Sequence, residues 1–313
     1  MYKGQRIAVV IPAYNEELLI LETLGGIPDY VDRMFVVNDA SHDATLRLIT
    51  EQQQRDPRVV IINHEKNKGL GQSLIDGYVA SRESDIDVTA IMAGDNQMHP
   101  DDLAGLLDKL MDGKYDYVKG NRLLHRNIGS MPRYRFFGNA LLTILTKFAT
   151  GYYPLMDPQC GYTVIKNSAL REIPIEKMTK GYGYNADILC MLNIHGFRVT
   201  DAQVRPVYDR EKSKIKLWKY IPKTSWLLVR LFFRRLGQRY VVRDFHPLVL
   251  FYFYAIFNLA FIALPLTVRF LYLYFTLNET PMTTLTILAL VLTTAFQSIL
   301  FAIWMDMDYN RVR

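Results

Sequence analysis

Residues 6–17 read RIAVVIPAYNEE, an apolar run that ends at Pro12 and passes directly into polar and acidic residues. Short runs rich in Ile and Val, without polar alternation, are typical of strands that are buried on both faces of a sheet. The sequence therefore predicts a buried strand over residues 6–11, followed by a polar loop. The same pattern returns three more times along the chain.

Three further strands are predicted over residues 34–37, 59–62 and 88–92. Helical stretches separate them, at residues 16–26, 43–55, 71–82 and 100–113. Short apolar strands that alternate with helices are typical of α/β folds in which helices cover both faces of a parallel sheet. We therefore expect an α/β domain with a mainly parallel central sheet over residues 1–212.

A polar cluster follows each of the four predicted strands, at residues 12–17, 38–45, 63–69 and 93–100. Ligands of open parallel sheets bind beyond the carboxyl ends of the strands. One such cluster is an ordinary turn with a helix cap, but four in succession favour a ligand site. The last contains Asp95 in a Gly-Asp-Asn-Gln turn, where a carboxylate can hold Mg²⁺ or Mn²⁺ beside a substrate diphosphate.

Four motifs together resemble the family 2 glycosyltransferases, which have a GT-A fold: IPAYNEE (11–17), VNDASHDAT (37–45), NKGLGQSL (67–74) and GDNQMHPDDL (94–103). The segments KGNR (119–122), RYRFFGN (133–139) and DPQCGY (157–162) are similar to those of polyprenyl-phosphate glycosyltransferases, the group of dolichol-phosphate mannose synthase. The resemblance covers roughly residues 6–214. It implies a GT-A (Rossmann-like) nucleotide-sugar-binding domain.

The resemblance also implies roles for single residues. The donor pocket would contain Pro12, Tyr14, Glu16, Asp39 and Lys68. Of these residues, Asp39 would contact the base. Asp95 and Gln97 would lie at the metal ion and the diphosphate, and the acceptor phosphate would be held by Arg122, Arg135 and Asn139, with Arg133 beside them. Arg210 and Lys214 would come from a segment that closes over the donor. Asp187 joins Asp95, Arg122 and Arg135 as a catalytic candidate.

The implied reaction is inverting transfer of a sugar from a UDP- or GDP-sugar to a polyprenyl or dolichyl phosphate. A phosphate monoester has a second pKa near ~6, so it is already a nucleophile at neutral pH, and arginines suffice to position it. One departure concerns the metal: the family often has Asp-x-Asp-x-Gln where this chain has Ala93-x-Asp95-x-Gln97. Metal binding is therefore weaker, or relies on Asp95 and phosphate oxygens.

Two other functions stay open. Polysaccharide synthases resemble the same family but carry a Gln-x-x-Arg-Trp motif, and none of Trp218, Trp226 and Trp304 follows an arginine. A non-catalytic membrane protein that retains the fold is the second, and Ala93 is the residue that keeps it open.

His42, His64, His99 and His195 lack metal-ligand spacing and are interpreted as ordinary loop or packing residues. Two cysteines without CxxC spacing indicate neither a disulfide framework nor a zinc site.

The C-terminal third predicts a membrane anchor. Residues 248–268 and 282–305 contain no charged residue. Each of these runs is long enough for a helix that crosses ~30 Å of hydrocarbon. We expect a transmembrane hairpin over residues 245–313, with helices at about 247–275 and 282–305. Residues 213–244 are expected to form one or two amphipathic helices in the membrane interface, which Pro222 starts or breaks.

Charge placement suggests the orientation. Residues 205–243 contain twelve Lys and Arg against two acidic residues, directly before the first apolar run. Such a block favours anionic lipid headgroups over nucleic acid, and it places both flanks of the hairpin in the cytosol. The N-terminus has no signal-peptide pattern, so we expect a cytosolic catalytic domain. A homo-oligomer is compatible with the sequence.

Overall fold

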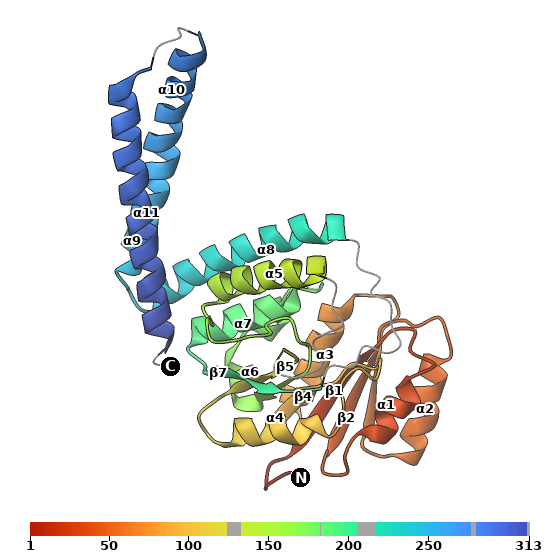
Figure 1. Cartoon of the computed structure of the whole chain (residues 1–313). Helices are drawn as coiled ribbons and strands as arrows, with labels where there is room; N and C mark the ends of the chain where they lie inside the picture. Colours follow the sequence, from red (N-terminus) through yellow and green to blue (C-terminus); the bar gives the residue numbers. More distant parts are fainter. Residues whose placement is uncertain (124–132, 182, 206–216, 277–279, 312–313) are drawn as a thin grey trace. The chain divides into compact units, whose positions relative to one another are not determined.

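The structure, a computed structural model, describes residues 1–123, 133–181, 183–205, 217–276 and 280–311, with side chains described outside 133–139 and 217–221. The chain divides into two compact units, Met1–Arg235 and Leu236–Arg313 (Figure 1). The first unit contains the sheet and the second contains the two long apolar helices.

The first unit is built on one seven-stranded sheet. Its strands are β1 (Ile7–Ala13), β2 (Arg33–Asn38), β3 (Val59–Asn63), β4 (Val88–Ile91), β5 (Tyr117–Asn121), β6 (Thr163–Lys166) and β7 (Val199–Gln203). The spatial order is β3-β2-β1-β4-β6-β5-β7. β6 runs antiparallel to both of its neighbours, and the other pairs are parallel. The predicted α/β fold with a mainly parallel sheet is therefore confirmed.

Helices cover both faces of this sheet (Figure 1). The helices of the first unit are α1 (Ile20–Gly26), α2 (Thr45–Arg55), α3 (Leu70–Glu83), α4 (Asp102–Met111), α5 (Arg133–Thr150), α6 (Asn167–Glu172), α7 (Tyr184–His195) and α8 (Leu217–Gly237), with a 3-10 turn, η2, at Ile175–Lys177. Residues of α1, α2 and α4 share one apolar core, and residues of α3, α6 and α7 share the other. Ile7, Val9 and Ile11 enter the first core whereas Ala8 and Val10 enter the second, which explains why this strand has no polar alternation.

β1 continues two residues beyond the predicted end, through Pro12 to Ala13. Proline normally disrupts a central strand because it lacks an N–H for the ladder. Here the β1–β4 ladder has ended at Val10, while the β1–β2 ladder runs on to Ala13. Pro12 directs its carbonyl to the β4 side, where Gly94 N–H donates to it at 3.2 Å, so the missing donor removes no ladder bond.

α8 is a single helix that continues through Pro222, and the prediction that this residue starts or breaks a helix is wrong. Proline removes one backbone hydrogen bond and crowds the preceding turn. The helix is nevertheless held by Leu228 and Leu231, which are buried against Ala186, Cys190 and Ile194 of α7. Tertiary packing therefore outweighs the local cost of the proline.

The second unit contains two helices long and apolar enough to cross a membrane, Leu248–Thr276 and Met282–Arg311. The first is built from α9 (Leu248–Phe257), a π-helical turn η4 (Asn258–Ala263) and α10 (Leu264–Thr276); the second is α11, and another π-helical turn, η3 (Gln238–Arg243), precedes α9. α11 runs six residues beyond its predicted end. Tyr240 Oη donates to the buried carboxylate of Asp306, and Asn310 Nδ2 donates to Tyr240 Oη at 2.8 Å, so the polar end of α11 is held inside the unit.

Candidate active site

The loops that follow β1 and β2 are joined by hydrogen bonds at the carboxyl end of the sheet. Asn15 N–H donates to Ser41 Oγ at 3.0 Å, and His42 N–H donates to Asn15 Oδ1 at 2.9 Å. Asn15, Ala40 and Asn96 have φ of 57°, 57° and 55°, and they stand in the loops after β1, β2 and β4. Left-handed backbone at non-glycine residues is strained and concentrates at functional sites. Three such residues at one end of the sheet mark that end as the candidate site.

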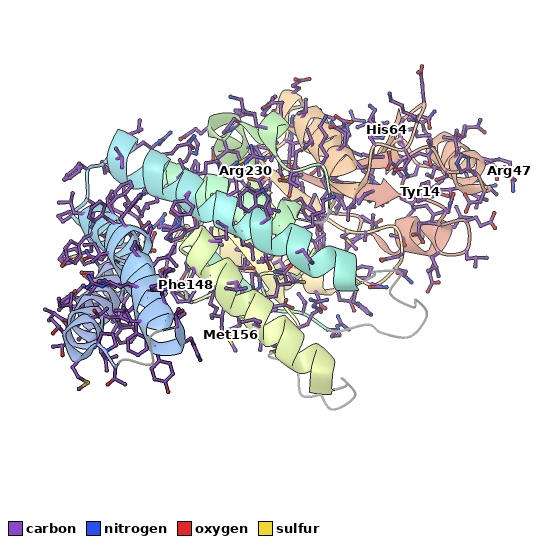
Figure 2. All side chains as sticks on the ribbon, turned by 90° about the horizontal axis from the view of Figure 1, so that it is seen from above. Tyr14, Arg47, His64, Phe148, Met156 and Arg230 are labelled. Carbon is purple, nitrogen blue, oxygen red and sulfur yellow. The ribbon has the colours of Figure 1, made fainter. Side chains whose placement is uncertain are left out.

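Residues of the predicted donor pocket gather here. Pro12 lies near the end of β1, where its carbonyl accepts the Gly94 N–H, and Tyr14, which is 43% exposed, directs its ring edge-on toward His42 with centroids 6.5 Å apart. Glu16 N–H donates to Thr45 Oγ1 at 2.8 Å, which joins the β1 loop to the start of α2. Figure 2 shows Tyr14 and His64 in the same part of the first unit.

Asp39 is 4% exposed, and its carboxylate accepts three hydrogen bonds from the protein. The donors are the backbone N–H groups of Lys68 and Gly69, both at 2.8 Å, and Nδ1 of His64, at 2.7 Å from Oδ1. Gly69 has φ +89° and is the N-cap of α3, so Asp39 fixes the loop that leads into this helix. The structure therefore gives Asp39 an internal role in addition to the predicted contact with a base.

His64 is the residue that sequence reasoning passed over. Its side chain is 2% exposed and lies between two carboxylates, with Nδ1 2.7 Å from Asp39 Oδ1 and Nε2 2.8 Å from Asp76 Oδ2. Each ring nitrogen thus faces a carboxylate oxygen, and the imidazole bridges the loop after β2 and helix α3. Lys68 Nζ also lies 3.8 Å from Asp76 Oδ2. In the sequence, the spacing His64-x4-Gly69 before α3 was the signal that could have identified this residue.

The loop after β4, residues 92–101, contains the predicted metal ligands. Asp95 Oδ1 accepts the N–H of Gln97 at 3.1 Å, which closes a tight turn with Asn96 in the left-handed region. Gly94 is packed against the end of β1, since a Cβ there would lie 3.2 Å from the Pro12 carbonyl oxygen. The β4 loop and the β1 loop are therefore in direct contact.

Among the described residues, no three His, Cys, Asp or Glu side chains are grouped to hold a metal ion. The Asp95 carboxylate and the Gln97 amide oxygen are nevertheless the hard donors that Mg²⁺ and Mn²⁺ accept. Mg²⁺ sites on phosphate substrates use one or two carboxylates, and substrate oxygens and water complete them. The residues of this loop therefore fit a metal that arrives with a diphosphate.

Arg122 stands at the end of β5 and pairs with Asp157 through two hydrogen bonds. Nε donates to Oδ2 at 2.8 Å and Nη2 donates to Oδ1 at 3.2 Å, in the bidentate arrangement that guanidinium and carboxylate favour. The Asp157 side chain is 6% exposed, whereas that of Arg122 is 37% exposed. Arg122 is thus oriented by a buried carboxylate, while its own side chain is partly exposed.

Tyr184 connects Arg122 with the β4 loop. Burial raises the pKa of its phenol, which lies within electrostatic range of both Arg122 and Asp95. Tyr184 Oη and Met98 Cε each lie 3.1 Å from the place that a Cβ on Gly161 would occupy. Tyr162 Oη also donates to the His99 carbonyl at 3.2 Å. Residues 157–162 therefore pack on the β4 loop, and the structure brings Asp95 and Arg122 to one site.

Asp187 lies elsewhere in the network. It is 2% exposed in the first turn of α7, where Oδ2 accepts the N–H of Thr179 at 2.8 Å and its hydroxyl at 2.6 Å. Oδ1 accepts a hydrogen bond from Arg234 Nη2 of α8. These contacts connect α7, α8 and the segment before α7. They give Asp187 a packing role, and its predicted catalytic role stays a prediction.

Other predicted residues lie outside the described side chains. Arg133, Arg135 and Asn139 belong to the first two turns of α5, where only the backbone is described, and Arg210 and Lys214 fall between residues 205 and 217. Their implied roles at the acceptor and the donor stay predictions.

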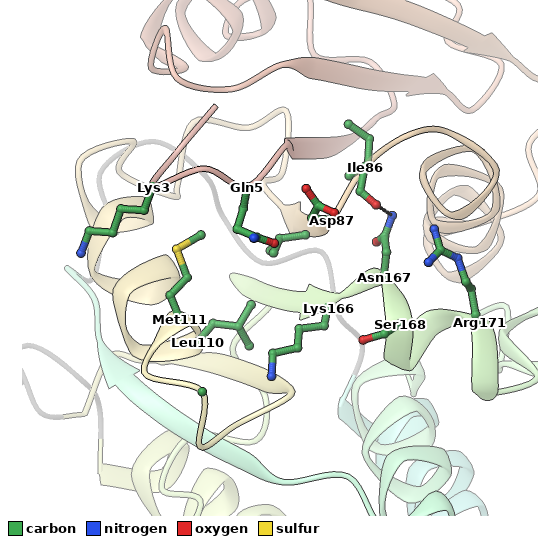
Figure 3. A pocket seen from close by; sticks show the side chains of 12 residues that line it. Lys3, Gln5, Ile86, Asp87, Leu110, Met111, Lys166, Asn167, Ser168 and Arg171 are labelled. Carbon is green, nitrogen blue, oxygen red and sulfur yellow. Dashed lines mark hydrogen bonds between the residues drawn. The ribbon is translucent and has the colours of Figure 1, made fainter.

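A pocket of about 510 Å³ opens at the opposite end of the sheet (Figure 3). Lys3, Lys166 and Arg171 line it, together with Asp87 before β4 and the C-terminal end of α4. Lys3 Nζ is 2.8 Å from Asp108 and Lys166 Nζ is 3.1 Å from Asp116, so these cations already have partners. Because the parallel strands start here, this pocket is separate from the candidate site.

Comparison with known proteins names the family. The sequence profile "Glycosyl transferase family 2" matches residues 8–173, more than half of the chain. The chain belongs to glycosyl transferase family 2. The match covers β1 through α6, including the four loops and the Arg122–Asp157 pair. The predicted family is therefore confirmed.

Curated relatives of this family 2 glycosyltransferase include enzymes named for lipid phosphates. The UDP-N-acetylglucosamine–dolichyl-phosphate N-acetylglucosaminyltransferase of Methanococcus voltae is 26% identical over 64% of this chain and 86% of its own length. The undecaprenyl-phosphate mannosyltransferase of Micrococcus luteus is 28% identical over 68% and 87%. The names share a lipid-phosphate acceptor and differ in the sugar.

Among solved structures, glucosyl-3-phosphoglycerate synthase of Mycobacterium tuberculosis in complex with Mn²⁺, UDP and phosphoglyceric acid superimposes with a TM-score of 0.56. The similarity covers 75% of this chain and 79% of that chain, at 18% identity. At this identity the similarity concerns the fold. The predicted GT-A fold of this family 2 glycosyltransferase is confirmed.

Proposed function

We propose that this family 2 glycosyltransferase transfers a sugar, with inversion, from a UDP- or GDP-sugar to a polyprenyl or dolichyl phosphate at the cytosolic membrane face. The observation that supports this proposal best is the packing of residues 157–162 on the β4 loop, where Tyr162 Oη donates to the His99 carbonyl at 3.2 Å, because this packing brings the Arg122–Asp157 pair near the loop that contains Asp95. The β4 loop has the ligand chemistry of a diphosphate site and the pair contains a partly exposed arginine. A phosphate nucleophile and a diphosphate leaving group need these two elements on opposite sides of the transferred sugar.

On the donor side, the loops after β1 and β2 would bind the nucleoside, with Pro12, Tyr14 and Glu16 in contact with it. The hydrogen bonds that Asp39 accepts from the N–H groups of Lys68 and Gly69 would keep this pocket in shape before the donor arrives. Asp95 and Gln97 would hold Mg²⁺ or Mn²⁺, which offsets charge on the departing diphosphate. The Mn²⁺ and UDP bound by the solved structural neighbour support this choice of ligands.

On the acceptor side, Arg122 would bind the phosphate while Asp157 fixes its orientation. Arg135 and Asn139 of α5 would complete the phosphate site, with Arg133 nearby. Arg210 and Lys214 would close over the donor. Because the phosphate is already ionised, the protein contributes orientation and charge neutralisation rather than a strong base. The lipid-phosphate acceptors in the names of the curated relatives support this acceptor class.

The side-by-side helices α5 and α8 supply a surface for membrane lipids (Figures 1 and 2). Both helices expose large apolar side chains: Leu141, Ile144 and Leu145 on α5, and Trp226, Val229 and Phe233 on α8. The inward face of α8 is already packed on α7 through Leu228 and Leu231. An apolar outer face with Lys223 and Arg230 exposed beside it fits an interface with anionic headgroups.

The two long apolar helices of the second unit would anchor the protein as a hairpin, with both termini in the cytosol. We retain the division into a catalytic domain (1–212), interfacial helices (213–244) and a hairpin (245–313) as part of this proposal. The hairpin would keep the catalytic domain at the surface where polyprenyl phosphates present their headgroups.

The experiment is nucleotide diphosphate release by the full chain in liposomes, with a panel of UDP- and GDP-sugars and with Mn²⁺ or Mg²⁺. Polyprenyl phosphate should stimulate release with one donor, and Asp95→Ala should lower the rate at least about a hundredfold. Release that is equal with and without the lipid would refute the acceptor. Nucleotide binding without turnover on any acceptor would favour a non-catalytic protein.

A further inference from the structure

Lys119 is a buried cation inside the sheet that the proposed reaction does not use. It lies in β5, three residues before Arg122, and it is 0% exposed. Its Nζ donates to the Asn185 Oδ1 of α7 at 2.7 Å and to the carbonyl oxygen of Cys160. Burial lowers the pKa of Lys119 to about 8, against 10.5 for an ordinary lysine. A side chain of this kind changes charge close to neutral pH.

The groups around Lys119 connect it to the candidate acceptor site. Cys160 and Asp157 lie in the segment that precedes β6, and Arg122 directly follows β5; Asp157 and Arg122 interact electrostatically with Lys119. Asp201 of β7 is its cross-strand neighbour, and accepts hydrogen bonds from Asn121 Nδ2 and Met156 N–H. Asn185, from α7, is neutral. Tyr184 stays protonated because burial raises its pKa.

Charge counting shows what Lys119 adds. Arg122 and Asp157 form a bidentate pair, so together they carry no net charge toward a phosphate. A lipid phosphate carries close to two negative charges above its second pKa near ~6. Lys119 supplies a positive charge in a region without solvent screening, where its field acts over several ångströms. Its bond to the Cys160 carbonyl also fixes the segment that carries Asp157.

We propose that Lys119 is a positioning residue of the acceptor site: its buried ammonium group offsets the negative charge of Asp201 and so keeps the Arg122–Asp157 end of the site free of net negative charge, and acceptor phosphate binding and Lys119 protonation stabilise each other. This inference rests on the proposed function, since it takes the anion at Arg122 to be the acceptor. Lys119 makes no contact with the substrate and acts through Asp157 and Arg122. The affinity for the acceptor phosphate therefore decreases as Lys119 loses its proton.

The test is calorimetric titration of a short-chain polyprenyl phosphate into the full-length protein in detergent at pH 8, in two buffers of different ionisation enthalpy. The ligand is already dianionic at pH 8, so any buffer dependence of the heat reports protons taken up by the protein. Lys119 is half protonated at its pKa, so wild type should take up about half a proton per phosphate bound. Lys119→Met should take up none and should bind about tenfold more weakly.

Lys166→Met is the matched control, because Lys166 is also a strand lysine but pairs with Asp116 at the opposite end of the sheet. This variant should keep the wild-type uptake and affinity. Saturable binding with equal heats in both buffers would overturn the role of Lys119 and leave the proposed function intact. No saturable binding, together with no lipid-dependent turnover, would instead refute the acceptor.

Lys119→Met leaves two buried acceptors without a donor and can fail to fold. The wild type then supplies the second measurement, the KM for polyprenyl phosphate between pH 7 and pH 9. The KM should rise several-fold across this range while kcat changes less, because the proton is needed to bind the phosphate. A KM that stays constant from pH 7 to pH 9 would contradict the proposal, since ionisation of the ligand is complete at the start of the range.

Discussion

Arg234 of α8 donates a hydrogen bond to the buried carboxylate of Asp187 in α7, and the other oxygen of this carboxylate is taken by Thr179. The Arg234 side chain is 27% exposed and that of Asp187 is 3% exposed. Lys180, next to Thr179, accepts the N–H of Gly71 at 2.9 Å. Helix α8 is thereby connected, through α7 and the segment before it, to the first turn of α3.

Asp187→Asn should mainly lower stability. It leaves Arg234 without its carboxylate partner, and loss of one member of a buried pair costs about 3 kcal/mol, at the low end here because Arg234 is partly exposed. Thermal unfolding in detergent and kcat measured well below the transition will separate the two roles. An unchanged unfolding temperature with a hundredfold lower kcat would make Asp187 catalytic. Arg47→Met, in an exposed pair with Glu51, is the control for loss of an ordinary ion pair.

Ala93→Asp should strengthen metal binding. Residue 93 stands two positions before Asp95 in the β4 loop, and a second carboxylate there raises the ligand charge available to a divalent cation. The Mn²⁺ concentration that gives half-maximal activity should fall at least about tenfold. Ala93→Asn, which has the same shape without the charge, should behave like wild type. Equal half-maximal concentrations in all three proteins would mean that the metal does not lie beside residue 93.

His64→Phe should weaken nucleotide binding. The imidazole bridges Asp39 and Asp76, and without it a buried carboxylate loses one of its three donors. The cost of a lost buried partner is about 2 kcal/mol, or at least tenfold in the Kd for UDP if Asp39 shapes the pocket. His195→Phe is the matched control, because His195 contacts the carbonyl of Met191 on α7. Equal UDP affinities in both variants would exclude a role for His64 in the donor pocket.

Trp226 should enter the lipid headgroup region. It is 73% exposed on the outer face of α8, and the chain has two other tryptophans, Trp218 and Trp304. With both replaced by Phe, fluorescence of Trp226 in liposomes should be quenched by lipids brominated near the headgroup. Moving the only tryptophan to position 47, an exposed residue of α2, should abolish the quenching. An unquenched Trp226 would show that α8 does not lie on the bilayer.

The stability of the protein should rise with pH because of Lys119. In the unfolded chain Lys119 keeps its proton to about pH 10.5, whereas in the folded chain its pKa is about 8. The unfolded state therefore binds more protons between these values, and the free energy of unfolding increases with pH there, by at most about 3 kcal/mol. The unfolding temperature of the wild type, relative to that of Lys119→Met, should therefore rise from pH 7 to pH 10. A constant difference would mean that Lys119 titrates normally.

Sequence patterns were sufficient where one physical requirement dominates. β1 is buried on both faces, so its residues must be apolar, and the change to polar residues after Ala13 marks its end. β7 reads VTDAQ and lies at the border of the sheet, partly exposed, so neither an apolar run nor a clear alternation marks it. β5 reads YVKGN and is fully buried, but its lysine interrupts the apolar run by which such a strand is recognised in a sequence. Strands of these two kinds were not predicted.

The residues of the candidate site could be proposed from the sequence, but their contacts could not. Asp39, Asp95 and Arg122 were identified from motifs, but a motif does not show which oxygen of a carboxylate is already occupied. The partners of Asp39 come from residues 64–69, and Asp157, the partner of Arg122, is 35 residues away. Such pairings depend on how the strands are ordered in space. His64 was interpreted as a loop or packing residue because it lacks metal-ligand spacing, and its two partners, 25 and 12 residues away in the chain, are not apparent from the sequence.

The reversed direction of β6 has a consequence for the segment between β5 and β6. The chain leaves the sheet after β5 at Arg122 and returns to β6 at Thr163, and β5 and β6 are hydrogen-bonded neighbours. Both ends of this 40-residue excursion, which contains α5, therefore lie at the same end of the sheet as the donor loops. Insertions or exchanges within the excursion leave every strand in register. Under the proposed function, the segment that would bind the acceptor is therefore an insertion between two neighbouring strands, and the loops that would bind the donor lie outside it.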